Sequence, residues 1–275
     1  MLNKLKLTWY SSYKVNAIRN KIASMMKSTQ DTRLIFIFGC QRSGTTIVQK
    51  IIALNPGVKI YGEGDKPYFF QAGAKDKNRL IKDKDVLNEL KLEPHNQIIL
   101  KPLYDSQRAE KLIDEFEKSK GVWVFRNYKD VINSHLQFYK QNAKDYLRPL
   151  FISDNSSWLN EVITKDVKAI IDNYDIDELS ASDLYALFWL VRNSLYFQVE
   201  HNSNVFLLNY DQLLENPSSI LMGMCKFVDL PFHDFYSSSI RVGSGAKKLN
   251  IKLLPEIELE CEHLYKKLLQ FVELN

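Results

Sequence analysis

The stretch that decides the fold is residues 34–46, LIFIFGCQRSGTT, in which an apolar run precedes a glycine-bracketed loop and a Thr-Thr pair. The apolar run predicts a buried strand, and the threonine pair predicts the start of a helix. A strand, a glycine-rich turn and a helix N-terminus aim several backbone N–H groups and the positive end of the helix dipole at one point. The stretch therefore predicts a phosphate-binding loop.

The loop departs from the usual nucleotide-hydrolysing pattern. Its spacing Gly39-x4-Gly44 matches a Walker A loop, but Thr45 stands where the lysine should follow. That lysine normally handles the triphosphate together with a Ser/Thr ligand of Mg²⁺. The pattern also differs from a cysteine phosphatase loop, in which an arginine takes the sixth position after the cysteine. Here Thr46 takes it, so Cys40 is interpreted as a small loop residue and not as a nucleophile.

Composition and charge are those of an ordinary globular protein. The 275 residues are 45% hydrophobic and 25% charged, which fits one globular domain over residues 1–275, with or without an added subdomain. The net charge of +4 suits an anionic small ligand and gives no reason to expect nucleic acid. Cys40, Cys225 and Cys261 lack disulfide or metal spacing, so we expect no metal and a cytoplasmic location.

The N-terminal segment is basic. It contains six Lys/Arg and no acid through residue 27, and we interpret residues 1–32 as a helical extension that leans on the domain. Peripheral contact with an anionic lipid surface or an acidic partner stays open. No run of about 18 apolar residues occurs, so the sequence predicts no membrane span.

Strand and helix signals alternate along the chain, which predicts a P-loop-like, three-layer α/β/α domain with a mainly parallel sheet. Expected strands cover residues 34–38, 97–101, 121–125 and 204–208. Expected helices cover residues 45–54, 106–118, 129–141, 217–228 and 256–274.

Residues 142–201 interrupt this alternation with an aromatic-rich stretch that has no convincing strand. Ser182 and Asp183 form a good helix start, and apolar residues then recur at helical spacing. The stretch is interpreted as a helical insertion that shapes the acceptor site, although most of its aromatic residues are expected in the core.

Three of the expected strands end in anion-binding groups. The loop 39–46, Lys101 and Arg126 each follow such a strand. Ligands of open parallel sheets bind beyond the carboxyl ends of the strands. We therefore expect these groups to face one site. Taken alone, Arg126 would more readily pair with a nearby acid, and Ser134 would merely pack.

Two segments together resemble a known family. GCQRSGTTIVQKII and VFRNYKDVINSHLQF closely resemble the two nucleotide-binding signatures of sulfotransferases that use 3′-phosphoadenosine 5′-phosphosulfate (PAPS), and LLNYDQLLENP resembles a later segment of that family. The resemblance runs from about residue 33 to 235 and implies two sites for the two ends of the donor. The residues implied for the 5′-phosphosulfate are Arg42, Ser43, Gly44, Thr45 and Thr46, and those for the 3′-phosphate are Arg126 and Ser134.

The resemblance also implies catalytic residues. Leu103 stands where cytosolic members carry a histidine base, whereas Glu63, between two glycines, is similar to the catalytic glutamate of carbohydrate and tyrosylprotein sulfotransferases. Lys101 and Arg42 are implied to stabilise the leaving phosphate. His135 is an alternative base that we interpret as incidental, and Asp65 is the neighbour that could be confused with Glu63.

The sequence leaves the acceptor open. The glutamate-type resemblance favours a saccharide or related small hydroxyl compound. Lys247 and Lys248, in a Gly/Ser/basic loop with Arg241 and Ser244, are further candidates for the 3′-phosphate, although a solvated basic loop is equally compatible with the sequence. A degenerate P-loop kinase and a catalytically silent nucleotide-binding module remain as alternative hypotheses.

Overall fold

The computed structural model describes residues 32–63, 65–70, 79–80, 84–93, 95, 97–139, 143–151, 163–238, 240 and 249–274. Within this part of the chain, a five-stranded sheet has the order β2-β5-β1-β6-β7, and neighbouring strands are parallel. A two-residue antiparallel pair, β3-β4, lies apart from it. The strands are β1 (Arg33–Gly39), β2 (Val58–Tyr61), β3 (Phe69–Phe70), β4 (Arg79–Leu80), β5 (Gln97–Leu100), β6 (Lys120–Phe125) and β7 (Val205–Asn209).

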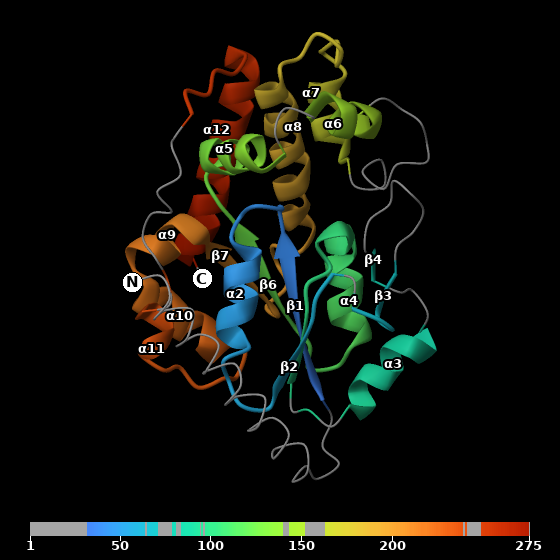
Figure 1. The fold of residues 1–275 in the computed structure, drawn as a ribbon, viewed down its shortest axis with the longest axis vertical. Helices are drawn as coiled ribbons and strands as arrows, with labels where there is room; N and C mark the ends of the chain where they lie inside the picture. The colour runs from blue at the N-terminus through green and yellow to red at the C-terminus, as the bar shows by residue number, and fades with distance from the viewer. Residues whose placement is uncertain are drawn as a thin grey trace.

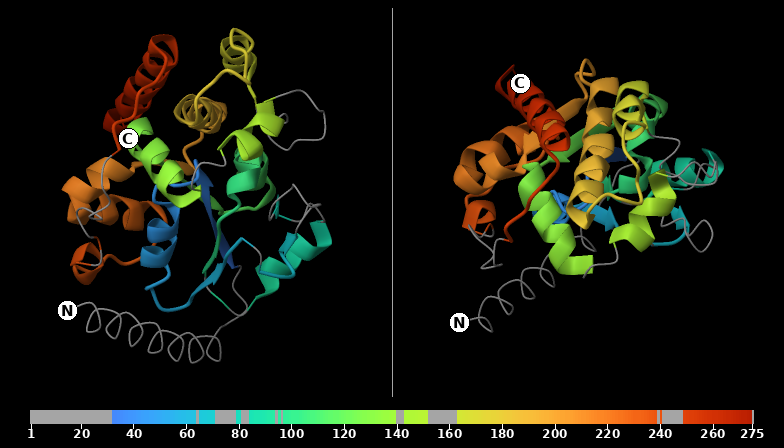
Figure 2. Two further views of the ribbon diagram at one scale, coloured as in Figure 1. Left: turned by 45° about the horizontal axis from the view of Figure 1, so that its top comes forward. Right: turned by 90° about the horizontal axis from the view of Figure 1, so that it is seen from above.

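Helices cover both faces of the sheet, as Figures 1 and 2 show. The α-helices are α2 (Thr45–Ile52), α3 (Lys84–Leu92), α4 (Ala109–Glu115), α5 (Tyr128–Tyr139), α6 (Ala143–Phe151), α7 (Lys165–Ile171), α8 (Ala181–Ser194), α9 (Tyr210–Glu215), α10 (Pro217–Phe227), α11 (Phe235–Ser238) and α12 (Pro255–Leu274). Two 3₁₀ helices are η1 (Leu103–Arg108) and η2 (Leu195–Gln198). The three-layer α/β/α architecture predicted from the sequence is confirmed.

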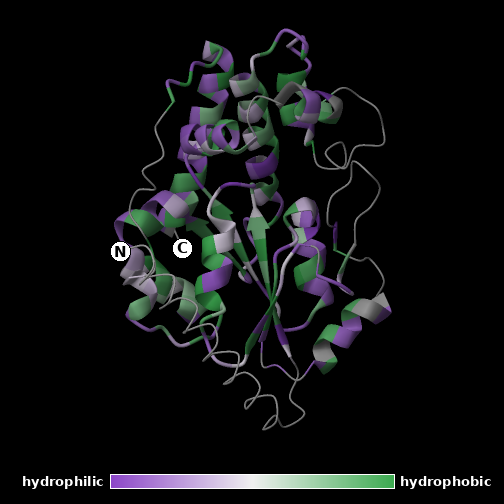
Figure 3. Ribbon diagram, in the orientation of Figure 1, coloured by the Kyte–Doolittle hydropathy of each residue, from purple (hydrophilic) through white to green (hydrophobic). Residues whose placement is uncertain are grey.

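Residues on β1 alternate between two apolar cores because successive strand side chains point to opposite faces. Phe36 and Phe38 belong to the larger core, which α8 and α12 cover, whereas Ile35 and Ile37 belong to the core under α2 and α10. Both faces are apolar, so the central strand reads as a continuous hydrophobic run. Figure 3 shows the strands of the sheet as predominantly hydrophobic.

The four predicted strands are present with ends shifted by a residue or so, and β2 adds a fifth strand at the sheet edge. The segment expected as one helix over 106–118 is instead the 3₁₀ helix η1 followed by α4. The described part of the insertion is helical, as expected, and contains α6, α7 and α8. Among the described residues, no helix has the length and apolarity needed to cross a membrane.

Helix α8 begins two residues earlier than the sequence suggested. Ser180, and not Ser182, is the N-cap: its hydroxyl accepts from the N–H of Asp183 at 3.2 Å, and the Asp183 carboxylate accepts from the N–H of Ser180 at 3.2 Å. This reciprocal pair is a capping box. The second carboxylate oxygen of Asp183 accepts from the N–H of Leu254 at 2.9 Å, so the cap also holds the chain that enters α12.

Several predicted features lie outside the described residues. These are nearly all of the basic extension 1–32, and the loop that contains Arg241, Ser244, Lys247 and Lys248.

A pair of serine substitutions distinguishes the observed cap from the predicted one. Ser180→Ala removes an N-cap, so it is expected to lower the free energy of unfolding by about 1 kcal/mol. Ser182→Ala, the matched control inside the helix, is expected to change it by less than about 0.5 kcal/mol. Urea titrations followed by circular dichroism measure both, and the opposite ranking would contradict the assigned cap.

Candidate active site

The phosphate-binding loop has the backbone of an anion site. Three of its residues have positive φ angles: Gly39 at 125°, Arg42 at 70° and Gly44 at 92°. Gly44 is the N-cap of α2 and makes no side-chain capping bond, so the first N–H groups of the helix are not satisfied by a side-chain cap. A left-handed arginine is uncommon, and such backbone is held in place by its surroundings. The fold thus presents backbone donors at the place where the sequence predicted phosphate.

Close backbone approach explains both glycines. A Cβ on Gly39 would lie 2.1 Å from the carbonyl oxygen of Val124 on β6. A Cβ on Gly44 would lie 2.2 Å from the ring of Tyr210, at the start of α9. The loop is therefore seated directly against the two strand ends that follow it in the sheet.

Arg42 reaches helix α5. Its Nε donates to the hydroxyl of Ser134 at 3.0 Å, and its guanidinium lies 4.3 Å from the ring centroid of Phe138. The structure thus brings together one residue predicted for the 5′ end of the donor, Arg42, and one predicted for the 3′-phosphate, Ser134.

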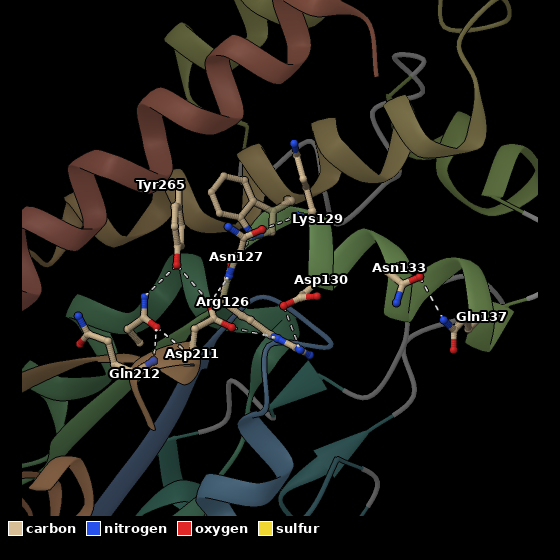
Figure 4. A network of polar contacts seen from close by, with 11 residues as sticks. Arg126, Asn127, Lys129, Asp130, Asn133, Gln137, Asp211, Gln212 and Tyr265 are labelled. Carbon is tan, nitrogen blue, oxygen red and sulfur yellow. Dashed lines mark hydrogen bonds and ion pairs between the residues drawn. The ribbon is translucent and has the colours of Figure 1, made fainter. Parts of the chain in front are cut away.

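Arg126, directly after β6, is held by acids (Figure 4). Its Nη2 lies 3.3 Å from Asp130 and its Nε lies 3.4 Å from Asp211. Asp211 also accepts from the N–H of Asn127 at 2.7 Å and from the hydroxyl of Tyr265 on α12 at 3.2 Å. The acid pairing weighed from the sequence is therefore present. A guanidinium has five N–H donors, so these pairs leave it with capacity for another anion.

Lys101 links the loop to Glu63. Its amino group donates to the hydroxyl of Thr46 at 3.0 Å and lies 3.9 Å from the Glu63 carboxylate. Lys101 follows β5 and Glu63 follows β2, two neighbouring parallel strands whose carboxyl ends lie at the same edge of the sheet. The sheet therefore places a carboxylate, an amine and the phosphate-binding loop side by side.

The environment of Glu63 shifts the pKa of its carboxyl group. Burial raises the pKa of this carboxyl above its ordinary value, and the nearby charge of Lys101, the backbone N–H of Leu103 and the charge of Arg192 oppose that rise in part. A carboxyl group with a raised pKa beside a cation is the arrangement expected of a general base.

A series of tyrosines begins near the carboxyl group. Burial raises the pKa of Tyr104, a hydrogen bond with Tyr146 on α6 opposes that rise, and the Glu63 charge adds to it. Tyr146 stacks on Tyr139 of α5 with ring centroids 6.2 Å apart. Tyr104 thus connects Glu63 to aromatic rings on α5 and α6.

Two other titratable residues near the loop are unsuited to catalysis. His135 is buried and stacks on Tyr185 at 4.7 Å, and burial followed by the charge of Arg42 lowers its pKa to about 3. Burial raises the pKa of the Cys40 thiol to about 12, and all three cysteines of the chain are buried and free. These findings agree with the interpretation of His135 as incidental and of Cys40 as a small loop residue.

Sequence reasoning missed four residues that organise the site. Asp211 pairs with Arg126 and accepts from Tyr265, whereas Arg192 and Ser106 hold the start of the loop. Arg192 could have been suspected, because a lone charge lies within the apolar run LFWLVRN. The other three have no such signal, since their partners are distant in sequence.

Fold and site define a three-layer α/β/α domain in which a carboxylate and an amine lie beside a glycine-bracketed loop at the carboxyl ends of the strands. The sequence also matches the sulfotransferase domain family over residues 32–249, and the chain belongs to that family. The match confirms the enzyme class predicted from the sequence, a PAPS-dependent sulfotransferase. None of the curated proteins matches the chain significantly.

Solved structures agree with this fold. The sulfotransferase domain from the curacin biosynthetic pathway is 14% identical with a TM-score of 0.54, over 85% of this chain and 98% of that one. The sulfotransferase domain from the Synechococcus PCC 7002 olefin synthase is 13% identical with a TM-score of 0.53, over 88% of this chain and 96% of that one. At such identities the likeness concerns the fold.

Two glycine substitutions of opposite expected sign test the loop geometry. Gly44→Ala forces a Cβ into the Tyr210 ring at a positive φ, and we expect it to lower the free energy of unfolding by about 1 kcal/mol or more. Gly223→Ala, inside α10 with its nearest contact at 3.9 Å, is expected to stabilise by about 0.4–1 kcal/mol. Urea unfolding compares the two, and a neutral Gly44→Ala would contradict the close approach.

Proposed function

We propose that the enzyme transfers the sulfuryl group of PAPS to the hydroxyl of a saccharide or related small molecule, with Glu63 as the general base. The contact of Lys101 with both Thr46 and Glu63 is the observation that carries the proposal. It links the group that would receive the proton to the loop that would hold the donor. The loop lacks the Walker lysine, which disfavours a kinase, and its intact neighbourhood of charged residues disfavours a silent module.

In the proposed reaction, the acceptor attacks one side of the sulfur and the phosphate leaves from the other. The acceptor oxygen forms a bond to sulfur and gives its proton to Glu63, while the bond from sulfur to the phosphate oxygen breaks. Negative charge then accumulates on the leaving 5′-phosphate. Lys101, Arg42 and the loop N–H groups stabilise that charge, and they do so without reorganisation because the fold already holds them.

Arg126 and Ser134 hold the 3′-phosphate in this proposal. The ion pairs of Arg126 with Asp130 and Asp211 orient its guanidinium and leave N–H groups for phosphate. Ser134 shares its hydroxyl with Arg42 and so connects the two ends of the donor site. The family resemblance assigns both roles, and this contact supports them.

The tyrosines that Tyr104 connects to Glu63 suit a neutral, ring-shaped acceptor. Tyr104, Tyr139 and Tyr146 combine apolar ring faces with hydroxyl groups, a combination that accommodates a sugar face and its hydroxyls. These elements belong to η1, α5 and the insertion, so acceptor selectivity is assigned to them.

The donor assignment is tested by calorimetry with 3′,5′-diphosphoadenosine (PAP), the product, and with adenosine 5′-phosphate, which lacks the 3′-phosphate. Arg126→Met is expected to weaken PAP binding about 10- to 100-fold because a charge-assisted contact is lost. Its affinity for adenosine 5′-phosphate should change little. Arg33→Met, which removes an arginine paired with Asp229 at the opposite end of the sheet, is the control. No PAP binding by the wild-type enzyme at millimolar concentration would refute the proposal.

The base assignment is tested by Glu63→Gln with PAPS and a panel of saccharides, phenols and tyrosyl peptides. We expect PAP affinity within about threefold of wild type and turnover reduced about 10²- to 10⁴-fold. Asp65→Asn, an exposed carboxylate two residues away, is the control and should keep most of the activity. Wild-type kcat/KM should fall as acid protonates Glu63, with an apparent pKa above that of an ordinary glutamate because burial raises it. Unchanged turnover in Glu63→Gln would exclude Glu63 as the base.

A further inference from the structure

A buried arginine on α8 binds the backbone at two strand ends. Arg192 is 0% exposed, although it carries a guanidinium, and it lies outside both family signatures. Its Nη2 donates to the carbonyl oxygen of Gly39 at 3.2 Å, to the hydroxyl of Ser106 at 3.0 Å and to the carbonyl oxygen of Leu103. The contacted groups belong to the end of β1 and to η1, which follows β5.

Ser106 completes the arrangement. Its hydroxyl accepts from the N–H of Gly39 at 3.2 Å and donates to the carbonyl oxygen of Leu103 at 2.9 Å. Gly39 is the first residue of the phosphate-binding loop. Its N–H and its carbonyl oxygen are therefore both hydrogen-bonded to side chains, the N–H to Ser106 and the oxygen to Arg192. These residues form what we call the Gly39 clamp: Arg192, Ser106 and the backbone of Gly39 and Leu103.

The clamp reaches Glu63 through Leu103. The N–H of Leu103 donates to the carbonyl oxygen of Lys101 at 3.0 Å and helps to hold down the pKa of Glu63, while the carbonyl oxygen of Leu103 accepts from Arg192. Leu103 lies two residues after Lys101, so one short turn joins the leaving-group lysine, the base and the clamp. Burying a guanidinium is costly unless hydrogen bonds compensate it. Its retention at this junction points to a function beyond packing.

We propose that Arg192 is a positioning residue, which fixes the phosphate-binding loop and the turn carrying Lys101 relative to Glu63 and couples both to helix α8. The proposal rests on the proposed function for its catalytic consequence only. Helix α8 packs against α5, α6 and α12, so it is the part of the insertion in contact with the elements on the acceptor side. Arg192 thus connects the acceptor side of the protein to the donor loop.

The charge of Arg192 acts on the pKa of Glu63, which can be measured and which a purely structural role would leave unchanged. The charged and titratable groups that act on Glu63 are Lys101 after β5, Arg192 on α8 and Tyr104 in η1. Arg192 opposes the rise of the Glu63 pKa that burial causes. Removing this charge should therefore raise that pKa further, and the acid limb of the kcat/KM profile should move to higher pH.

Three variants separate the roles of the Nη2 contacts and of the charge. Arg192→Met is expected to weaken PAP binding at least about 10-fold, because the loop loses its support, and to move the acid limb to higher pH. Arg192→Lys keeps a charge, but its amino group ends one bond short of the Nη2 position, so it should weaken PAP binding while leaving the acid limb near its wild-type position. Leu187→Ala, a buried apolar truncation on the same helix, is the control and should lower the melting temperature without changing either quantity.

The outcomes are distinguishable. If Arg192→Met lowers only the melting temperature, with PAP affinity and acid limb as in Leu187→Ala, the proposal is overturned. If Arg192→Met does not fold, Ser106→Ala replaces it, with an expected loss of PAP affinity of about threefold to tenfold; an unchanged affinity then overturns the proposal. If Glu63→Gln keeps full turnover, the base assignment fails and the acid limb no longer reports the pKa of Glu63. The PAP affinities of the Arg192 and Ser106 variants still test the clamp in that case.

Discussion

The close seating of the phosphate-binding loop against the neighbouring strands is the constraint on which the site depends. Only a residue without a Cβ can bring the Gly39 backbone against the Val124 carbonyl or admit the Tyr210 ring beside Gly44. The positive φ angles that follow from this seating turn the loop so that the N-terminus of α2 is left without a side-chain cap. The anion site is therefore a consequence of how strand β1 ends between its neighbours.

The parallel sheet then gathers the chemistry at one edge. Parallel strands place their carboxyl ends together, so groups far apart in the sequence become neighbours. Glu63 after β2, Lys101 after β5 and the loop after β1 are joined by two contacts, from Lys101 to Thr46 and from Lys101 to Glu63. No long-range loop rearrangement is needed for this assembly, because the order β2-β5-β1 already sets it.

The fold and the approach of Lys101 and Glu63 to the loop could be predicted because their signals are local. The apolar run of β1, the glycine spacing and the residues at strand ends all lie within short windows of sequence. The Gly39 clamp and the ion pair of Arg126 with Asp211 could not be predicted in the same way. Arg192 and Gly39 are 153 residues apart, and Arg126 and Asp211 are 85 residues apart, so only tertiary packing reveals these partners. The start of α8 was misjudged because two nearby serines have similar capping ability, and the Asp183 partner selects Ser180.

Under the proposed function, Arg126 and the Gly39 backbone are supported in different ways at the two anionic ends of the donor. At Arg126 the support is anionic: two carboxylates orient a guanidinium that is partly exposed, and its charge is partly compensated before any phosphate arrives. At Gly39 the support is cationic and buried, and it binds carbonyl oxygens, so its charge adds to the potential beneath the loop. The positive potential is thus expected to be greatest below the loop, on the side where negative charge develops during sulfuryl transfer. A preorganised cation there stabilises the transition state more than the bound donor, because the leaving phosphate gains charge as the bond to sulfur breaks.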